Sequence, residues 1–288
     1  MCGFIGKISA NEINHEHLLA QNKMITCRGP DETKIQHGSL SEYNRSLNLH
    51  YALIFNRLAI IDLTDNASQP MYSKKFNTLI LFNGEVYNHK ILRKSLEAEG
   101  IDFSSDHSDT EVLLTGISKH GIKFIDSVIG QFSVVFFDFN TMKVFLIRDR
   151  VGQKPLFYSV DKNNLSFSSN LKSLAKLEGN RSINQSSVVD FLNYGVIPSP
   201  KTLFENIYKV KPGEMIEINM GNYFTIQNKS TYWDIESFRS EEKFNNKEFL
   251  SIFNEAVEQR MQADVNVAAL LSGGIDSTSV VKSLASKS

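Results

Sequence analysis

Short apolar runs dominate about the first two-thirds of the chain, and they predict a fold built mainly from β-strands. Each run is bounded by glycine, asparagine or aspartate, which are typical of turns. The predicted strands cover residues 2–9, 50–56, 77–83, 131–139, 143–149 and 164–169. Asn140 and Thr141 lie between two of these runs, and this spacing predicts a β-hairpin.

Apolar residues at helical spacing predict helices over residues 89–100, 109–121 and 186–195, and each of these segments closes on a glycine. Strands outnumber helices and do not alternate strictly with them. The pattern therefore favours a layered α+β architecture over a parallel Rossmann-type sheet.

The pattern changes after about residue 191. Pro198, Pro200 and Pro212 follow within a short span, as is typical of a domain junction. From residue 246 an amphipathic helix is predicted, then a buried strand over residues 264–271 and another helix. We therefore expect one domain over residues 2–215, a linker over 216–245, and the start of an α/β domain over 246–288.

Composition excludes several classes of protein. The 288 residues are 41% hydrophobic and 22% charged with a net charge of −1, so no overall field attracts nucleic acid or an anionic membrane. Neither a signal peptide nor a membrane-spanning run is recognisable, so a cytoplasmic protein is expected. Neither of the two cysteines, Cys2 and Cys27, lies in a CxxC pair, which argues against a disulfide framework or a cysteine-rich zinc site.

Cys2 is the first candidate for chemistry. A thiolate is a strong nucleophile, and removal of Met1 would free an α-amino group of pKa about 7.7–8.0 to accept its proton. The alternative is an accidental cysteine at a frayed terminus. The strand predicted directly after Cys2 argues against fraying.

The sequence SGGIDS over residues 272–277 is the second candidate. A glycine-rich loop between a strand and a helix exposes N–H groups to anionic oxygens, and hydroxyls add further donors. The loop resembles the pyrophosphate loop of ATP pyrophosphatases, which implies binding of ATP with Mg²⁺. Asp276 would support either Mg²⁺ or the loop itself. The predicted ATP-binding residues are Ser272, Gly273, Gly274, Asp276 and Ser277.

A series of motifs appears in order along residues 2–215. It comprises MCGFIG, RGPDE, NRLAIIDL, QPM, FNGEVYNH, SDTEVLL, GQFSVVFFD and RDRVGQKPLFY. The series resembles the glutaminase domain of the asparagine synthetase family, within the N-terminal-nucleophile class-II glutamine amidotransferases. The resemblance implies a four-layer αββα sandwich.

The resemblance also implies roles for six residues. Cys2 would attack glutamine, and two donors at Asn83 and Gly84 would form the oxyanion hole. A guanidinium binds a carboxylate bidentately, so Arg57 would hold the α-carboxylate of glutamine. Asp109 would pair with the substrate ammonium, and Glu85 would help to fix the substrate. Taken singly, an Asn-Gly pair is most often a turn and an arginine a solvated charge.

Other positions are expected to be structural or depart from the family. The loop from Arg28 to Asp31 would shape the pocket, and Cys27, where relatives more often carry histidine, would be a packing residue. Arg148 and Asp149 would form structural salt bridges or act in function, and both alternatives stay open. Asn170 stands where relatives usually carry glutamate, so any signalling role there is in doubt.

The leading interpretation is a glutamine-dependent enzyme with two coupled sites. Ammonia from glutamine would pass internally to an acyl-adenylate that ATP forms from aspartate, giving asparagine. The alternatives are a different carboxylate acceptor and a non-catalytic glutaminase-like module. The residues that select the acceptor are expected beyond Ser288, so residues 1–288 alone could hydrolyse glutamine but are not expected to make the amide. The family also suggests a homodimer.

Overall fold

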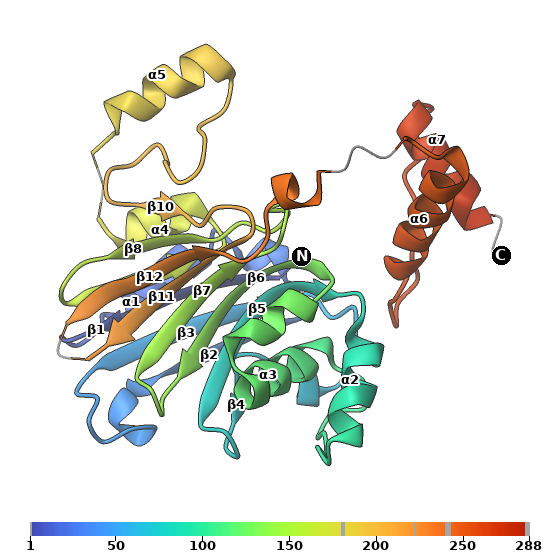
Figure 1. Ribbon diagram of the computed structural model, residues 1–288. Helices are drawn as coiled ribbons and strands as arrows, with labels where there is room; N and C mark the ends of the chain where they lie inside the picture. The colour runs from blue at the N-terminus through green and yellow to red at the C-terminus, as the bar shows by residue number, and fades with distance from the viewer. Residues whose placement is uncertain (1, 180–181, 222, 240–242, 286–288) are drawn as a thin grey trace.

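The structure is a computed structural model, and it describes residues 2–179, 182–221, 223–239 and 243–285. Met1, whose removal is expected, and Ser286, in the last predicted helix, lie outside the described residues. The main body consists of two antiparallel six-stranded sheets packed face to face (Figure 1). No described helix is long and apolar enough to cross a membrane.

The two sheets contain strands from distant parts of the chain. In order across the first sheet, the strands are β10 (Tyr208–Lys209), β8 (Phe157–Val160), β9 (Asn164–Ser168), β1 (Gly3–Ser9), β3 (His50–Arg57) and β2 (Glu32–Ser39). In order across the second sheet, they are β12 (Phe224–Thr231), β11 (Glu214–Met220), β7 (Lys143–Arg148), β6 (Gly130–Asp138), β5 (Thr78–Val86) and β4 (Met71–Ser73).

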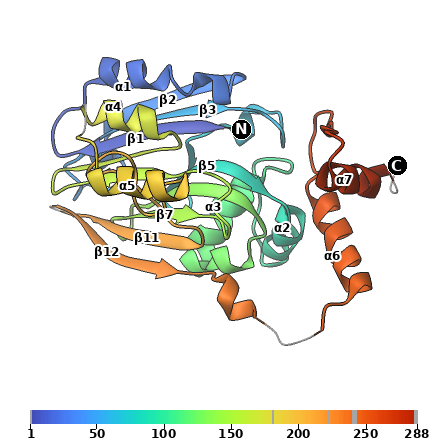
Figure 2. The same cartoon turned by 90° about the horizontal axis from the view of Figure 1, so that it is seen from above.

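Alternation along the strands explains the layers, because successive side chains point to opposite faces of a sheet. On β5, Leu79 and Leu81 pack into the core between the sheets, whereas Ile80 and Phe82 pack on the outer face. The outer face is covered by α2 (His89–Ala98) and α3 (Asp109–His120). On the first sheet, α1 (His15–Asn22) and α4 (Leu171–Leu177) cover the outer face (Figure 2). The predicted four-layer αββα sandwich is confirmed.

The three helices predicted in the first part of the chain are confirmed, and glycine marks each end. Gly100, Gly121 and Gly195 all have positive φ, at 81°, 76° and 71°, which glycine adopts without strain. Gly195 follows α5 (Gln185–Tyr194). Short 3-10 helices complete this part of the chain: η1 (Thr26–Arg28), η2 (Leu40–Glu42), η3 (Asp65–Ala67), η4 (Ile122–Ser127) and η5 (Ile235–Phe238).

The second sheet continues beyond residue 215. β11 pairs with β7 and with β12, so residues 216–220 and 224–231 belong to strands of the sandwich. The expected linker over residues 216–245 therefore begins with paired strands. The proline-rich stretch before it contains β10, which pairs with β8 at the edge of the first sheet.

The C-terminal part holds α6 (Asn246–Gln259) and α7 (Ile275–Ala285), which pack on each other beside α2 (Figures 1 and 2). The buried strand predicted over residues 264–271 is wrong. No strand forms there in the described residues, and Leu270 is 94% exposed. An isolated strand leaves its N–H and C=O groups unpaired, and the described residues supply no neighbouring strand for this segment.

Candidate active site

Cys2 lies directly before β1, at the end of the first sheet. The N–H of Leu58 donates to Cys2 Sγ over 3.4 Å, and Arg28 Nε donates to the carbonyl of Cys2 over 3.2 Å. Both contacts hold the terminus against the body of the protein, so the alternative of a frayed end does not describe this structure. Burial raises the pKa of the Cys2 thiol, and the hydrogen bond from Leu58 opposes the rise. A nearby base is therefore needed to produce the thiolate.

All six residues that the sequence assigned to the glutaminase site line one pocket. The pocket encloses about 550 Å³, part of it open to solvent. Its walls come from the first sheet, the second sheet and a helix. The six residues are Cys2, Arg57, Asn83, Gly84, Glu85 and Asp109.

Arg57, the last residue of β3, is held by the loop that follows it. Arg57 Nη1 donates to the carbonyl of Thr64 over 2.9 Å, and Nη2 donates to the carbonyl of Asp62. The side chain is only 8% exposed. These bonds fix the plane of the guanidinium at the pocket wall, so a carboxylate entering the pocket meets an oriented cation.

Asn83 on β5 is fully buried. Among the residues that the structure describes, neither Oδ1 nor Nδ2 of Asn83 has a hydrogen-bond partner. A buried amide without partners costs free energy, and in a pocket it provides a donor ready for a developing charge. Gly84 beside it allows a close approach of β6, because an added Cβ would lie 2.1 Å from the carbonyl oxygen of Gln131.

Asp109 is the first residue of α3, which Ser108 caps by accepting the N–H of Glu111 over 3.3 Å. The N–H of Val86 donates to Asp109 Oδ2 over 3.0 Å and holds the carboxylate in the pocket wall. Burial raises the pKa of Asp109 to about 7, and the negative charge of Glu85 contributes to the rise. A cation placed beside Asp109 would stabilise its ionised form.

Lys154 also lines the pocket, and no role for it was predicted from the sequence. Burial lowers the pKa of Lys154, and the charge of Glu85 opposes that shift. The loop before Lys154 is shaped by Asp149, whose carboxylate accepts N–H groups from Gln153 and Lys154 over 2.9 Å each. The signal that could have found it is the lysine within RDRVGQKPLFY.

The side chains of Arg148 and Asp149 form hydrogen bonds with backbone groups of the loop before Lys154 and its surroundings, rather than with each other. Arg148 donates to the carbonyls of Gly152, Lys154 and Val210 over 2.6–2.8 Å. These bonds favour the structural alternative, without the expected salt bridge. Asn170 has a structural role as well, because its side chain accepts the N–H of Ser173 over 3.0 Å and caps α4.

The expected pocket-shaping loop lies beside Cys2. Arg28 donates to the carbonyl of Cys2, and Asp31 accepts the N–H of Ala59 over 2.8 Å. Cys27 is an exposed free thiol, so its prediction as a packing residue is wrong. No residue of η1 is buried, so the whole of this turn, including Cys27, lies at the surface.

The candidate phosphate loop opens α7 as predicted. Gly273 has φ of 83°, and Ser272 Oγ lies 3.0 Å from Ser277 Oγ. Two hydroxyls and the first N–H groups of an eleven-residue helix suit phosphate oxygens. The described residues contain no group of three or more His, Cys, Asp or Glu side chains that could hold a metal ion. The loop thus has donors suited to phosphate oxygens.

Two family models match adjoining parts of the chain. The glutamine amidotransferase domain model matches residues 1–233, and the asparagine synthase model matches residues 248–288. The first match ends just after β12, in agreement with the extent of the sandwich.

Curated relatives resemble the chain over nearly its whole length. Asparagine synthetase [glutamine-hydrolyzing] 1 of Bacillus subtilis is 33% identical over 98% of this chain and 43% of its own length. Putative asparagine synthetase [glutamine-hydrolyzing] 2 of Methanocaldococcus jannaschii is 32% identical over 98% of this chain and 56% of its own length. Amidase chry2 of Gibberella zeae is 32% identical over 92% of this chain and 38% of its own length. The chain thus spans about half the length of these relatives, or less.

Solved structures share the fold at low sequence identity. The allosteric regulatory enzyme of purine biosynthesis matches with a TM-score of 0.56 and 18% identity, over 80% of this chain and 49% of the other. Glutamine phosphoribosylpyrophosphate amidotransferase from B. subtilis matches with a TM-score of 0.53 and 16% identity over the same shares. With the domain model covering residues 1–233, the chain belongs to the glutamine amidotransferase domain family.

Proposed function

We propose that this protein hydrolyses glutamine with Cys2 as nucleophile and delivers the ammonia to an ATP-dependent amidation, with aspartate as the acceptor. One observation carries the proposal. Six residues spread from position 2 to position 109 line a single pocket, and together they supply a thiol, an oxyanion donor, a cation and two carboxylates. A site this complete supports catalysis over the non-catalytic alternative.

The proposed chemistry has two steps. The α-amino group, freed when Met1 is removed, accepts the thiol proton, and Sγ attacks the side-chain amide carbon of glutamine. The oxygen of that amide becomes negative and takes hydrogen bonds from Asn83 Nδ2 and the N–H of Gly84. The C–N bond breaks, ammonia leaves with the added proton, and a thioester remains. Water then cleaves the C–S bond, which gives glutamate and restores the thiol.

Charge complementarity supports the choice of substrate. Arg57 would bind the α-carboxylate of glutamine and Asp109 its α-ammonium, which leaves the side-chain amide to reach Cys2. Glu85 would hold the substrate, and Lys154 would balance the negative charge of Glu85 in the pocket wall. A substrate ammonium would also favour the ionised form of Asp109, whose pKa burial raises.

The second half of the proposal rests on the C-terminal part. The match of residues 248–288 to the asparagine synthase model and the named relatives support an acyl-adenylate route from ATP. Ser272, Gly273, Gly274 and Ser277 would bind the phosphates. ATP would arrive with Mg²⁺, and Asp276 would support either that ion or the loop. An internal passage for ammonia, a cytoplasmic location and a homodimer remain expectations.

A different acceptor is the second candidate. It rests on two relatives that are named amidase rather than asparagine synthetase. They are Amidase chry2 and Amidase chyE of Penicillium rubens, and the second is 31% identical over 78% of this chain and 33% of its own length. Supplying aspartate or other carboxylates to the whole protein with ATP and glutamine, and identifying the amide formed, separates the two.

The test of the glutaminase is release of glutamate from glutamine by residues 1–288, beside Cys2→Ala. The N-terminal residue is first identified by mass spectrometry, because a retained Met1 blocks the amine. We expect activity in the unaltered chain and none in the variant. Equal activity in both would refute Cys2 as nucleophile, and no activity in either, with Met1 absent, would contradict a self-sufficient glutaminase.

A further inference from the structure

A short segment between α6 and the candidate phosphate loop contacts the sandwich. The N–H of Asp264 donates to the carbonyl of Ile60 over 2.8 Å, and Gln262 Nε2 donates to the carbonyl of Tyr87 over 2.6 Å. The guanidinium of Arg260 lies 4.7 Å from the centre of the Tyr87 ring, within the range of a cation–π contact. The C-terminal part thus contacts loops that border the glutamine pocket, since Ile60 is one of its lining residues.

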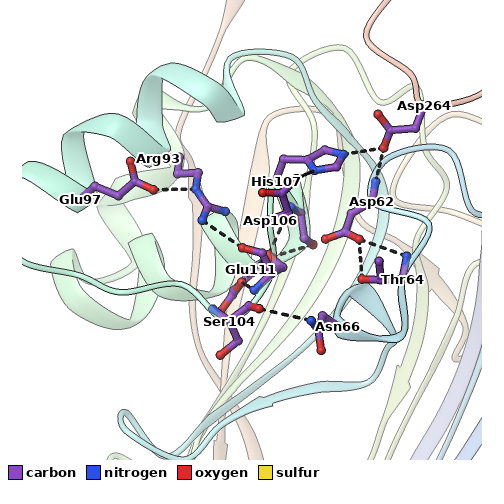
Figure 3. Close-up of polar contacts among 12 residues, drawn as sticks. Asp62, Thr64, Asn66, Arg93, Glu97, Ser104, Asp106, His107, Glu111 and Asp264 are labelled. Carbon is purple, nitrogen blue, oxygen red and sulfur yellow. Dashed lines mark hydrogen bonds and ion pairs between the residues drawn. The ribbon is translucent and has the colours of Figure 1, made fainter.

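The carboxylate of Asp264 joins two of these loops (Figure 3). Asp264 Oδ2 accepts the N–H of Asp62 over 2.7 Å and lies 2.5 Å from His107 Nε2. Asp62 belongs to the loop after β3, whereas His107 belongs to the turn before α3. The contact with Asp264 raises the pKa of His107 and lowers that of Asp264, so each favours the charged form of the other.

Each joined loop adjoins one of the residues expected to bind glutamine: Arg57 ends β3 before the first loop, and Asp109 begins α3 after the second. The carbonyls of Asp62 and Thr64 hold the guanidinium of Arg57. Asp62 has φ of 50°, a left-handed conformation that a non-glycine residue keeps only when its surroundings hold it. On the other side, Asp109 follows His107 by two residues and begins α3.

We propose that Asp264 is a positioning residue for the glutamine site. By bridging Asp62 and His107, its carboxylate sets the separation of Arg57 and Asp109, and through it the affinity for the amino-acid end of glutamine. The inference rests on the proposed glutaminase function. It gives the C-terminal part a direct effect on glutamine binding, in addition to any role with ATP.

The test compares Asp264→Ala and Asp264→Asn with the unaltered chain in the release of glutamate. Asp264→Ala removes both contacts of the carboxylate, so we expect the KM for glutamine to rise about tenfold with kcat changed less than about twofold. Asp264→Asn keeps one oxygen for the N–H of Asp62, so about a threefold rise is expected. Glu248→Ala, an exposed acidic residue on α6, is the matched control and leaves KM unchanged.

A second variant isolates the bridge. In His107→Ala we expect the KM for glutamine to rise less than in Asp264→Ala. In the double variant we expect the KM to be no higher than in Asp264→Ala alone. Effects that overlap in this way indicate one shared contact. Hydrogen exchange over residues 58–64 is expected to become faster in Asp264→Ala and to stay unchanged in Glu248→Ala.

The outcomes separate this inference from the proposed function. An unaltered chain that releases no glutamate would contradict a self-sufficient glutaminase and overturn the inference with it. If the unaltered chain hydrolyses glutamine and both Asp264 variants have the same KM as the unaltered chain, the inference alone is overturned. This holds even if hydrogen exchange becomes faster, because the contact would then only tether the C-terminal part to the sandwich. A fall in kcat without a change in KM would overturn it too. If Asp264→Ala fails to fold, Asp264→Asn, nearly identical in shape, decides the result.

Discussion

Replacing Asn83 with alanine should separate catalysis from stability. Asn83 is fully buried, and neither of its polar side-chain atoms has a partner among the described residues. Losing one oxyanion-hole donor typically costs about 2.7–4 kcal/mol of transition-state stabilisation, which corresponds to a 10²–10³-fold fall in kcat. The same donor does little for bound glutamine before charge develops, so we expect KM to stay within about twofold.

Stability should respond in the opposite direction. An unpaired buried polar group costs about 1–3 kcal/mol, and alanine removes that cost. The truncation also loses packing contacts and leaves a small cavity, which offsets part of the gain. The expected net change in the free energy of unfolding is about zero to +2 kcal/mol, so the melting temperature should be unchanged or higher.

The assay pairs steady-state glutamate release with thermal unfolding of the same preparation, and Asn56→Ala is the control. Asn56 is also fully buried on β3, but it has hydrogen-bond partners in Asn22 and Thr33. Asn56→Ala should therefore lower the melting temperature. Asn83→Ala that keeps more than about a third of the kcat would refute the oxyanion role. A large loss of stability in Asn83→Ala would refute the reading of its amide as unpaired.

Two further predictions concern the same pocket. Burial raises the pKa of Asp109 to about 7, so below that pH its carboxylate is protonated and cannot pair with an ammonium. The affinity for glutamine should therefore weaken as the pH falls through about 7. Calorimetry on Cys2→Ala measures this affinity. Asp109→Asn should bind weakly at every pH, and a slope that survives in that variant would point to another group. Gly84→Ala would place its Cβ 2.1 Å from the Gln131 carbonyl oxygen, so a loss of about 1–3 kcal/mol of stability is expected by thermal unfolding. An unchanged melting temperature in Gly84→Ala would show that β5 and β6 move apart easily.

Four of the six strands that the hydrophobic pattern missed lie at the edges of the sheets. The sheets have four edge strands, β2, β4, β10 and β12, and none was predicted. An edge strand buries little, as in β2, where Lys34 and Gln36 carry polar side chains, so its sequence lacks the apolar signal. Its identity as a strand comes from pairing with a neighbour. Two central strands, β8 and β11, were also missed. β11 could have been predicted, because every second residue of its sequence EMIEINM is buried.

Short-range features of the sequence determined much of this protein. Apolar runs determined most of the central strands, glycines the ends of the helices, and the ordered motifs the resemblance and the candidate residues. Each depends on residues close together in the chain, where local conformation and burial leave a readable pattern.

The tertiary structure alone decided how distant residues meet. It brings Cys2 to Leu58, adds Lys154 to the pocket, and joins Asp264 to the loops that hold Arg57 and Asp109. It also leaves residues 264–271 without a paired strand, although their apolar pattern predicts one. The reason is physical: a hydrogen-bond partner or a neighbouring strand is supplied by another part of the chain, and no local pattern records whether that partner is present.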